Sequence, residues 1–489
     1  MKPRRAISQK VAVGVVYVAA MTLSAVDSSI VNVALPAIGR DFHIAQASVG
    51  TISIGYLVAL AASIPASGWL GDRFGGKKVL LSAVVVFTLA SALCGLATSE
   101  TELVGFRILQ GIGGGMLAPV GMAMLYRVFP AQERVKVAAL IVPTISLAPV
   151  LGPVLGGLLV TSLSWRWVFL VNVPIGVMVI LFGLTFVAKS PSQEPGHFDA
   201  LGFALGASGL GLFMYGFSEG PFLGWGSTRV LATIPVGAGL IALLAIYELR
   251  NARPIVDVRL FANRMFRFAN GLAMIAMAAG FGGMYIATLY FQDGRGLSPL
   301  AAGLNTSPGA LGYMAGSQLV SRLFLPMLGP RRLASFGFLA LIVALVPFSF
   351  AGATTNLWPL RALMVAQGLA MSPVFLTLTT TAFSTISPGE MGRASTIFNA
   401  VRYLGGAIGV AILTTAMVAV GQTHLVEGRT VANLASYHAA WLVAAGLSLV
   451  GAVIALGIKD ADAAATIVKR VPRNARPDIS FKLEGALEP

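Results

Sequence analysis

Charged residues are scarce in this 489-residue chain: Asp, Glu, Lys and Arg make up 11% of it, whereas 56% is hydrophobic. So few charges cannot cover the surface of a water-soluble protein of this length. The mean hydropathy of +0.82 indicates that a lipid bilayer is its solvent. Backbone groups in lipid must bond within their own segment, so we expect helical spans of roughly 20 residues and exclude open sheets.

Cysteine and histidine are also rare. The single cysteine, Cys94, lies in an apolar run, which excludes an internal disulfide and a thiolate metal cluster. The four histidines fall at loops or span edges without metal-ligand spacing, and the phosphate-binding pattern G-x-x-x-x-G-K-[ST] is absent. The sequence therefore predicts no metal, no other cofactor and no ATP-driven activity.

Apolar runs fill the rest of the chain, and they predict an all-α membrane protein with fourteen spans. An even number of spans places both ends on one side of the membrane. The predicted spans are residues 11–35, 49–70, 79–97, 103–128, 136–161, 167–188, 200–219, 229–248, 268–291, 300–322, 332–353, 358–384, 394–420 and 437–458.

The distribution of Lys and Arg predicts the orientation. Five of the 34 basic residues fall on the side opposite the termini, three fall within spans, and the rest lie on the N-terminal side. The positive-inside rule then places both termini in the cytoplasm. Because topology explains much of the net charge of +15, and no single soluble face gathers it, we expect no nucleic-acid partner.

An internal repeat divides the chain. A shift of 254 residues superimposes Gly75 on Gly329, Arg107 on Arg361 and Pro119 on Pro373. It predicts a six-helix bundle in residues 1–190, two extra transmembrane helices in a linker at 191–262, a second six-helix bundle at 263–458, and a cytoplasmic tail at 459–489. Two bundles of like orientation are the architecture of a rocker transporter, with the substrate path between them.

Three short motifs carry a family resemblance. The loop Gly68-Trp69-Leu70-Gly71-Asp72-Arg73-Phe74-Gly75-Gly76-Lys77-Lys78 resembles the G-x-x-x-D-R-x-G-x-[KR]-[KR] loop of the major facilitator superfamily. Arg107-x-x-Gln110-Gly111-x-Gly113-Gly114-Gly115 resembles the intramembrane arginine motif of that superfamily. Gly152-Pro153-x-x-Gly156-Gly157 resembles its antiporter motif. These similarities imply a major facilitator fold.

Two longer stretches resemble a subfamily, the fourteen-span drug:proton antiporters typified by QacA and EmrB. They are residues 27–36, Asp27-Ser-Ser-Ile-Val-Asn-Val-Ala-Leu-Pro36, and residues 165–176, Trp165-Arg-Trp-Val-Phe-Leu-Val-Asn-Val-Pro-Ile-Gly176. The second copy of the loop motif departs from the pattern, because an apolar insert separates Arg322 from Gly329. That departure argues against a symmetric cytoplasmic gate.

Asp27 lies within the first predicted span, where a carboxylate costs about 2.5–3.5 kcal/mol. At about 1.5 Å per residue it lies roughly 24 Å along that span, and Arg107 falls at a similar depth on the antiparallel fourth span. We predict that the two face each other, with Asp27 carrying a proton and Arg107 setting its proton affinity. A static ion pair, or an Asp in a watery vestibule that never titrates, are the alternatives.

Three further sets of residues are candidates. Gly68, Asp72, Arg73, Gly75, Lys77 and Lys78 are predicted to form a cytoplasmic gate, or else a set of positive-inside anchors. Gly152, Pro153, Gly156 and Gly157 allow close helix approach and a bend, and the resemblance implies that they block proton leak. Low-specificity substrate contacts are predicted at Gln110, Met274, Met277, Tyr285, Asn305, Gln367, Asn399 and Tyr403, where ordinary helix packing is the alternative.

The resemblance implies a proton-coupled exporter of amphipathic, cationic or lipophilic small molecules that works by alternating access. We expect a monomer in a bacterial cytoplasmic membrane, with substrate, protons and lipid as its partners. A dedicated exporter of one metabolite, siderophore or antibiotic is an alternative. A membrane-embedded lipid enzyme is a remote one, because a nucleophile with a base, or a metal cluster, is not evident in the sequence.

Overall fold

The chain is seen here as a computed structural model, which describes residues 8–43, 51–130, 133, 148–189, 197–251, 254–387, 389–426 and 429–458. The helices are α1 (Gln9–Asp41), α2 (Thr51–Phe74), α3 (Gly76–Leu96), α4 (Glu100–Val128), α6 (Ala148–Ser162), α7 (Trp167–Leu170), α8 (Asn172–Phe186), α9 (Ala200–Leu223), α10 (Thr228–Arg250), α11 (Arg264–Leu289), α12 (Pro299–Thr306), α13 (Pro308–Leu319), α14 (Leu325–Leu345), α15 (Leu357–Thr381), α16 (Met391–Val420) and α17 (Leu434–Ala455).

Shorter elements join some of these helices. They are the 3-10 helices η1 (Val258–Ala262) and η4 (Val346–Phe350) and the π-helical turns η2 (Tyr290–Gly294) and η3 (Val320–Phe324). One antiparallel hairpin, β1 (Thr423–Val426) and β2 (Arg429–Ala432), pairs Thr423 with Ala432.

Twelve of the described helical segments are long and apolar enough to cross a membrane. Of the two other predicted spans, 136–161 lies partly outside the described residues, and its described part is α6. The span 300–322 is interrupted: α12 ends at Thr306 and α13 begins at Pro308, whose ring nitrogen cannot bond the carbonyl of Leu304. The Ser307 hydroxyl donates to that carbonyl at 2.9 Å instead. The count of fourteen spans stays a prediction.

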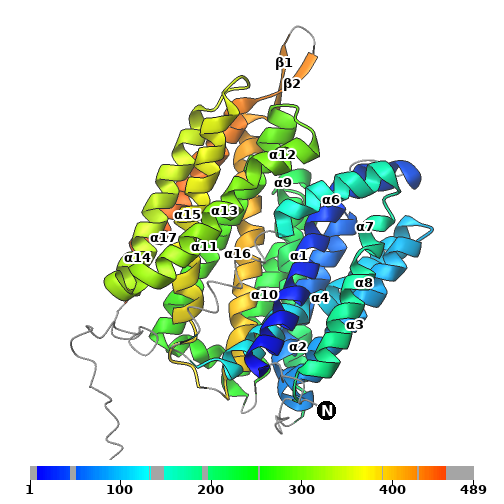
Figure 1. Ribbon diagram of the computed structural model, residues 1–489, viewed down its shortest axis with the longest axis vertical. Helices are drawn as coiled ribbons and strands as arrows, with labels where there is room; N and C mark the ends of the chain where they lie inside the picture. Colours follow the sequence, from blue (N-terminus) through cyan, green and yellow to red (C-terminus); the bar gives the residue numbers. More distant parts are fainter. Residues whose placement is uncertain are drawn as a thin grey trace, which may run out of the picture.

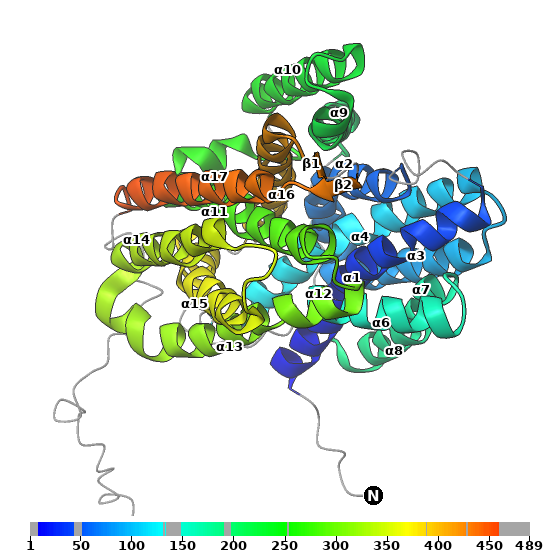
Figure 2. The same cartoon turned by 90° about the horizontal axis from the view of Figure 1, so that it is seen from above.

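The helices form two groups with a pair outside them (Figure 2). In the first, α4 packs against α1, α2 and α3, while α6 and α8 pack against α1; in the second, α15 packs against α13 and α14, and α17 against α11 and α14. Helix α9 packs against α2 and α16, and α10 packs against α9. The predicted borders at 190/191 and 262/263 fall between α8 and α9 and between η1 and α11, but as domain boundaries they stay predictions.

Helix α1 starts and helix α17 ends at the same end of the molecule, opposite the hairpin β1–β2 (Figure 1). At that end the Arg264 guanidinium donates to the carbonyl of Gly457 at 2.8 Å. That this end faces the cytoplasm remains a prediction from the charge count, and the predicted tail at 459–489 lies outside the described residues.

The backbone supports the internal repeat. Gly75 has a φ of 83°, and its repeat equivalent Gly329 has a φ of 74°. Side chains other than glycine avoid this left-handed region, so both copies of the loop need glycine at the same place. Gly75 separates α2 from α3, whereas Gly329 makes a kink within α14.

Candidate functional site

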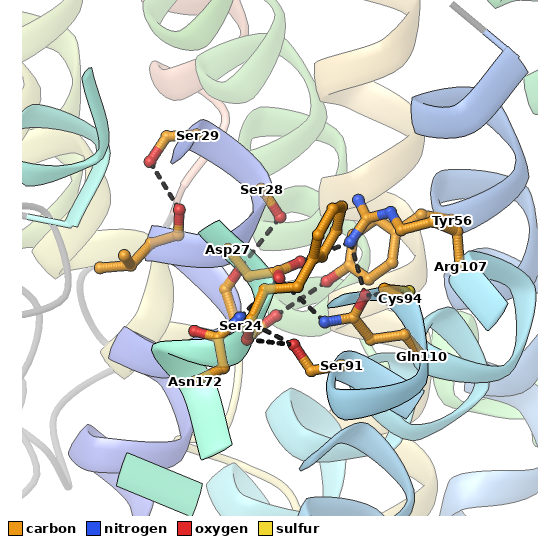
Figure 3. A network of polar contacts seen from close by, with 12 residues as sticks. Ser24, Asp27, Ser28, Ser29, Tyr56, Ser91, Cys94, Arg107, Gln110 and Asn172 are labelled. Carbon is orange, nitrogen blue, oxygen red and sulfur yellow. Dashed lines mark hydrogen bonds and ion pairs between the residues drawn. The ribbon is translucent and has the colours of Figure 1, made fainter. Parts of the chain in front are cut away.

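A buried polar cluster lies inside the first group of helices, within otherwise apolar surroundings (Figure 3). At its centre, Asp27 of α1 and Arg107 of α4 form an ion pair, with 2.6 Å between Oδ2 and Nη1. The Asp27 side chain is 0% exposed and that of Arg107 is 1% exposed. A charge pair so deeply buried is stable only when further hydrogen bonds satisfy it.

Two amides supply these bonds to the other carboxylate oxygen. Gln110 Nε2 donates to Asp27 Oδ1 at 2.8 Å, and Asn172 Nδ2 donates to the same oxygen at 2.7 Å. Gln110 also accepts from Arg107 at 2.7 Å, so it bridges both members of the ion pair. Three donors from α4 and α8 therefore fix the position of the carboxylate of α1.

Aromatic and hydroxyl groups complete the cluster. The guanidinium of Arg107 lies 4.1 Å from the ring centroid of Tyr56, a cation–π contact, and Tyr56 shares a hydrogen bond of 3.1 Å with Ser24. Asn172 also donates to Ser91 at 3.0 Å. Asn172 and Ser91 were not predicted as site residues. Their polar side chains within apolar spans are the feature of the sequence that could have indicated them.

Asn172 also lines a cavity beside α1. The cavity measures about 480 Å³, and its described walls are the apolar stripe of α1 from Gly14 to Val26 together with Asn172 and Ile175 of α8. Asn172 Oδ1 is buried and has no hydrogen-bond partner among the described residues. One amide thus connects this cavity with the Asp27 carboxylate.

The antiporter-motif glycines bring α6 against α1 just beyond Asp27. A Cβ on Gly152 would lie 2.6 Å from Ser29 Cβ, and one on Gly156 would lie 3.0 Å from Ile30 Cγ1, so neither position has room for a side chain. A Cβ on Gly157 would meet nothing within 4 Å. Pro153 lies in the same helix. The role of this motif against proton leak stays a prediction.

Hydrogen bonds from the segment before α7 hold the C-terminal end of α1, where Asp41 lies. Asp41 accepts hydrogen bonds from the Trp165 indole at 2.9 Å and from Arg166 at 3.0 Å, and both donors come from the stretch that resembles drug:proton antiporters. The Trp165 hydrogen bond, reinforced by the Arg166 charge, lowers the pKa of Asp41 below its ordinary value. Asp27 therefore lies on a helix that is tied at its far end to the segment before α7.

Two of the predicted gate residues, Gly68 and Asp72, lie where α2 meets α16 of the other group. A Cβ on Gly68 would lie 2.9 Å from Thr396 Oγ1, and Ser67 and Thr396 share a hydrogen bond of 3.1 Å. Asp72 is 3% exposed, bonds Arg127 at 2.6 Å and faces Gly392 near the N-terminus of α16, where the helix dipole favours a negative charge. Gly75 supplies the turn that follows.

The other gate candidates have different surroundings. Lys77 donates to the carbonyls of Leu184 and Val187 at the C-terminal end of α8. Arg73 and Lys78 are exposed. Ser395 of α16 donates to the carbonyl of Pro119 in α4 at 2.8 Å, and the cavity left beside Gly68 is about 10 Å³, the space of a single water. The two groups of helices are closed against each other at this end.

The predicted substrate contacts do not form one site. Gln110 belongs to the Asp27 cluster, and Asn305 accepts from Arg361 at 2.9 Å in the second group. Asn399 and Tyr403 lie on either side of Arg402 on α16, while Gln367 adjoins Gly283. The remaining candidates are on α11, where Met277 is buried and Met274 and Tyr285 are more exposed. Substrate contact stays a prediction for all eight.

Known proteins resemble the chain in sequence. Residues 17–410 match the family model described as Major Facilitator Superfamily. The chain is 34% identical over 405 residues to the multidrug resistance protein B homolog of Mycobacterium tuberculosis (strain ATCC 25618 / H37Rv), covering 82% of this chain and 74% of that protein. It is 32% identical over 410 residues to the tetracenomycin C resistance and export protein of Streptomyces glaucescens, covering 83% and 74%.

A solved structure resembles the fold. The human organic anion transporter MFSD10 (TETRAN) superimposes with a TM-score of 0.68 and covers 92% of this chain and 100% of that chain. The sequence identity is 17%, so this likeness concerns the fold alone.

Proposed function

Because this chain belongs to the major facilitator superfamily, we propose that it exports small amphipathic molecules in exchange for protons by alternating access. The predictions of a major facilitator fold and of a multi-pass membrane transporter are confirmed by the family match and the membrane-spanning helices. The same membership confirms that the chain is a transporter and not a lipid-modifying enzyme. Its relatives are named for drug resistance and export, which supports efflux as the direction of transport.

The observation that carries the proposal is the sealed ion pair of Asp27 and Arg107. A carboxylate with 0% exposure cannot exchange protons with either side of the membrane in this conformation. Proton exchange therefore requires α1 and α4 to move relative to each other, and we propose that this movement accompanies the rocking of the two groups that opens the substrate path. A buried acid whose partner leaves during the motion changes its proton affinity between states, which is what coupling needs.

Transport also requires the closed end of the molecule to open. Contacts of α2 and α4 with the first turns of α16 must break before a substrate can enter from that side. We propose that proton release from Asp27 favours closure, because the ionised carboxylate regains Arg107, Gln110 and Asn172. The protein would act as a monomer with both termini in the cytoplasm, as a drug:proton antiporter of the fourteen-span kind.

Asp27→Asn tests the coupling. In inverted membrane vesicles with an imposed pH gradient, the wild-type protein should dissipate the gradient when substrate is added, and Asp27→Asn should not. Glu102→Gln, at an exposed acid near the start of α4, is the matched control and should behave like the wild type. Gradient dissipation by Asp27→Asn at the wild-type rate would refute proton coupling through this residue.

A dedicated exporter is the second candidate function. One relative is named for resistance to and export of a single antibiotic, tetracenomycin C. A panel of structurally unrelated dyes and drugs in a pump-deficient host separates the two functions. Protection against several of them indicates multidrug efflux, and protection against one indicates a dedicated exporter.

A further inference from the structure

Arg402 lies deep in the membrane-spanning part of α16. It is eleven residues past the start of that helix at Met391, which at about 1.5 Å per residue is roughly 16 Å, or half of the hydrocarbon thickness. Helix α16 packs against α11 and α17 of its own group and against α2 and α4 of the other (Figure 2). Arg402 therefore lies at the depth, and on an element of the interface, where a rocker transporter holds its substrate.

The positive charge of Arg402 has no carboxylate partner among the described residues. Its Nη1 donates to Asn399 Oδ1 at 3.3 Å, and its Nε is buried without a hydrogen-bond partner in the described part of the chain. Of the two other arginines within spans, Arg107 also has an Nε without a described partner but pairs with Asp27 at 2.6 Å, and Arg361 bonds Asn305 at 2.9 Å. A guanidinium in the membrane interior is costly when left unpaired, so it needs a negative group.

Aromatic side chains surround this guanidinium. It lies 4.7 Å from the ring centroid of Phe375 on α15 and 5.8 Å from that of Phe398. Tyr313 of α13 has a buried hydroxyl without a described hydrogen-bond partner, and its ring centroid lies 6.5 Å from that of Phe375.

The chemistry of this cluster is that of an anion site with aromatic walls. A guanidinium and phenolic hydroxyls donate hydrogen bonds, and aromatic rings offer faces to a flat apolar body. A cationic substrate would meet the repulsion of Arg402, and the one acid in the middle of the membrane, Asp27, is already held by three donors. The cluster therefore disfavours the cationic substrates that the family resemblance suggested.

We propose that Arg402 binds the acidic group of an aromatic monoanion, a carboxylate or an ionised phenol, with the ring of the substrate against Phe375 and its anionic oxygens near Tyr313. This inference rests on the proposed function, since it names the substrate class of the same transporter. Exchange of a monoanion leaving for a proton entering moves net charge, so transport would depend on the membrane potential.

Equilibrium binding to the purified full-length protein in lipid nanodiscs tests the proposal without depending on proton coupling. The probes are 1-naphthoate, its neutral counterpart 1-naphthamide and its cationic counterpart 1-naphthylmethylammonium. The wild type should bind naphthoate at least tenfold more tightly than the other two. Arg402→Gln should lose this preference, and Arg402→Lys, which keeps the charge and guards against a folding defect, should retain part of it.

Arg361→Gln is the matched control, because it removes another arginine predicted to lie within a span of the second group and should leave the preference for naphthoate unchanged. Tyr313→Phe should weaken the binding of naphthoate several-fold and leave the binding of naphthamide unaffected. Equal binding of the three probes by the wild type, or an unaltered preference in Arg402→Gln, would overturn the proposal.

Asp27→Asn separates the two proposals. If it binds naphthoate normally but does not exchange protons, both proposals stand. If it binds naphthoate and still dissipates the pH gradient, proton coupling through Asp27 fails while the anion site remains.

Discussion

Individual side chains set the chemistry of the Asp27 cluster. Arg107 uses a single nitrogen, Nη1, to reach both Asp27 and Gln110, and its planar group stacks on Tyr56. A lysine would keep the charge but lose the planar stacking and the fixed directions of the guanidinium donors. The geometry of this residue, as well as its charge, should therefore matter for exchange.

Arg107→Lys should slow proton-coupled exchange about 10- to 100-fold, because one charge-assisted hydrogen bond of about 1.5–3 kcal/mol is lost or misplaced. Arg107→Ala should also lower the yield of folded protein, since it leaves a buried carboxylate without a cation at a cost of about 3–5 kcal/mol. Initial rates in vesicles and the yield of monodisperse protein measure the two effects. Arg229→Lys, at an exposed position, is the control, and a wild-type rate in Arg107→Lys would contradict the expectation.

Helix packing fixes where Asp27 can move. The absence of side chains at Gly152 and Gly156 lets α6 lie directly on α1, next to the residues that follow Asp27. Because both glycines face α1 while Gly157 faces open space, the three positions differ in packing although they share one motif. Close packing of α1 and α6 would keep water away from the carboxylate.

Gly152→Ala should destabilise the protein by about 1–3 kcal/mol, as overpacking does in well-filled interiors, and should reduce coupled exchange. Gly157→Ala should change neither, because its Cβ meets nothing within 4 Å. Thermal unfolding in detergent and proton leak in the absence of substrate measure these effects. Equal behaviour of the two variants would mean that the α1–α6 contact does not restrain the site.

The molecule as a whole is closed at the end where α2 and α4 meet α16. The polar contacts there include one hydroxyl pair, hydroxyl-to-carbonyl bonds from Ser395 and Tyr126, and the carboxylate of Asp72 near the α16 N-terminus. Apolar side chains of both groups, among them Tyr126 and Phe383, also pack together there and must separate as the groups rock. Removal of the close approach at Gly68 should thus favour the open state.

Gly68→Ala should shift the population toward a state open at this end, whereas Gly71→Ala, whose Cβ meets nothing within 4 Å, should not. Spin labels at Lys78 and Arg332, exposed residues after each copy of the repeat glycine, report the separation by pulsed electron paramagnetic resonance. Cys94 is the only native cysteine, so a Cys94→Ala background leaves two labelling sites. Identical distance distributions in both glycine variants would argue against a gate at Gly68.

The sequence by itself determined the solvent of this protein, its helical class and its family. Hydropathy is a local property, and a bilayer allows few structures that satisfy the backbone, so apolar runs alone predict spans. The same local information placed Asp27 and Arg107 at similar depths on antiparallel helices. It did not indicate the interruption at Pro308 within the predicted span 300–322, because the effect of a proline depends on how neighbouring groups satisfy the freed carbonyl.

Only the tertiary structure decided which side chains meet. Asn172 bonds Asp27 across 145 residues of sequence, and Tyr126 donates to the carbonyl of Thr379 across the two groups of helices. The lack of a carboxylate beside Arg402 in the described chain likewise depends on every helix packed around it. The depth of a residue in the membrane follows from its position along one helix. The side chains that it contacts depend on the rotation and crossing of several helices, which side-chain packing sets and no local pattern records.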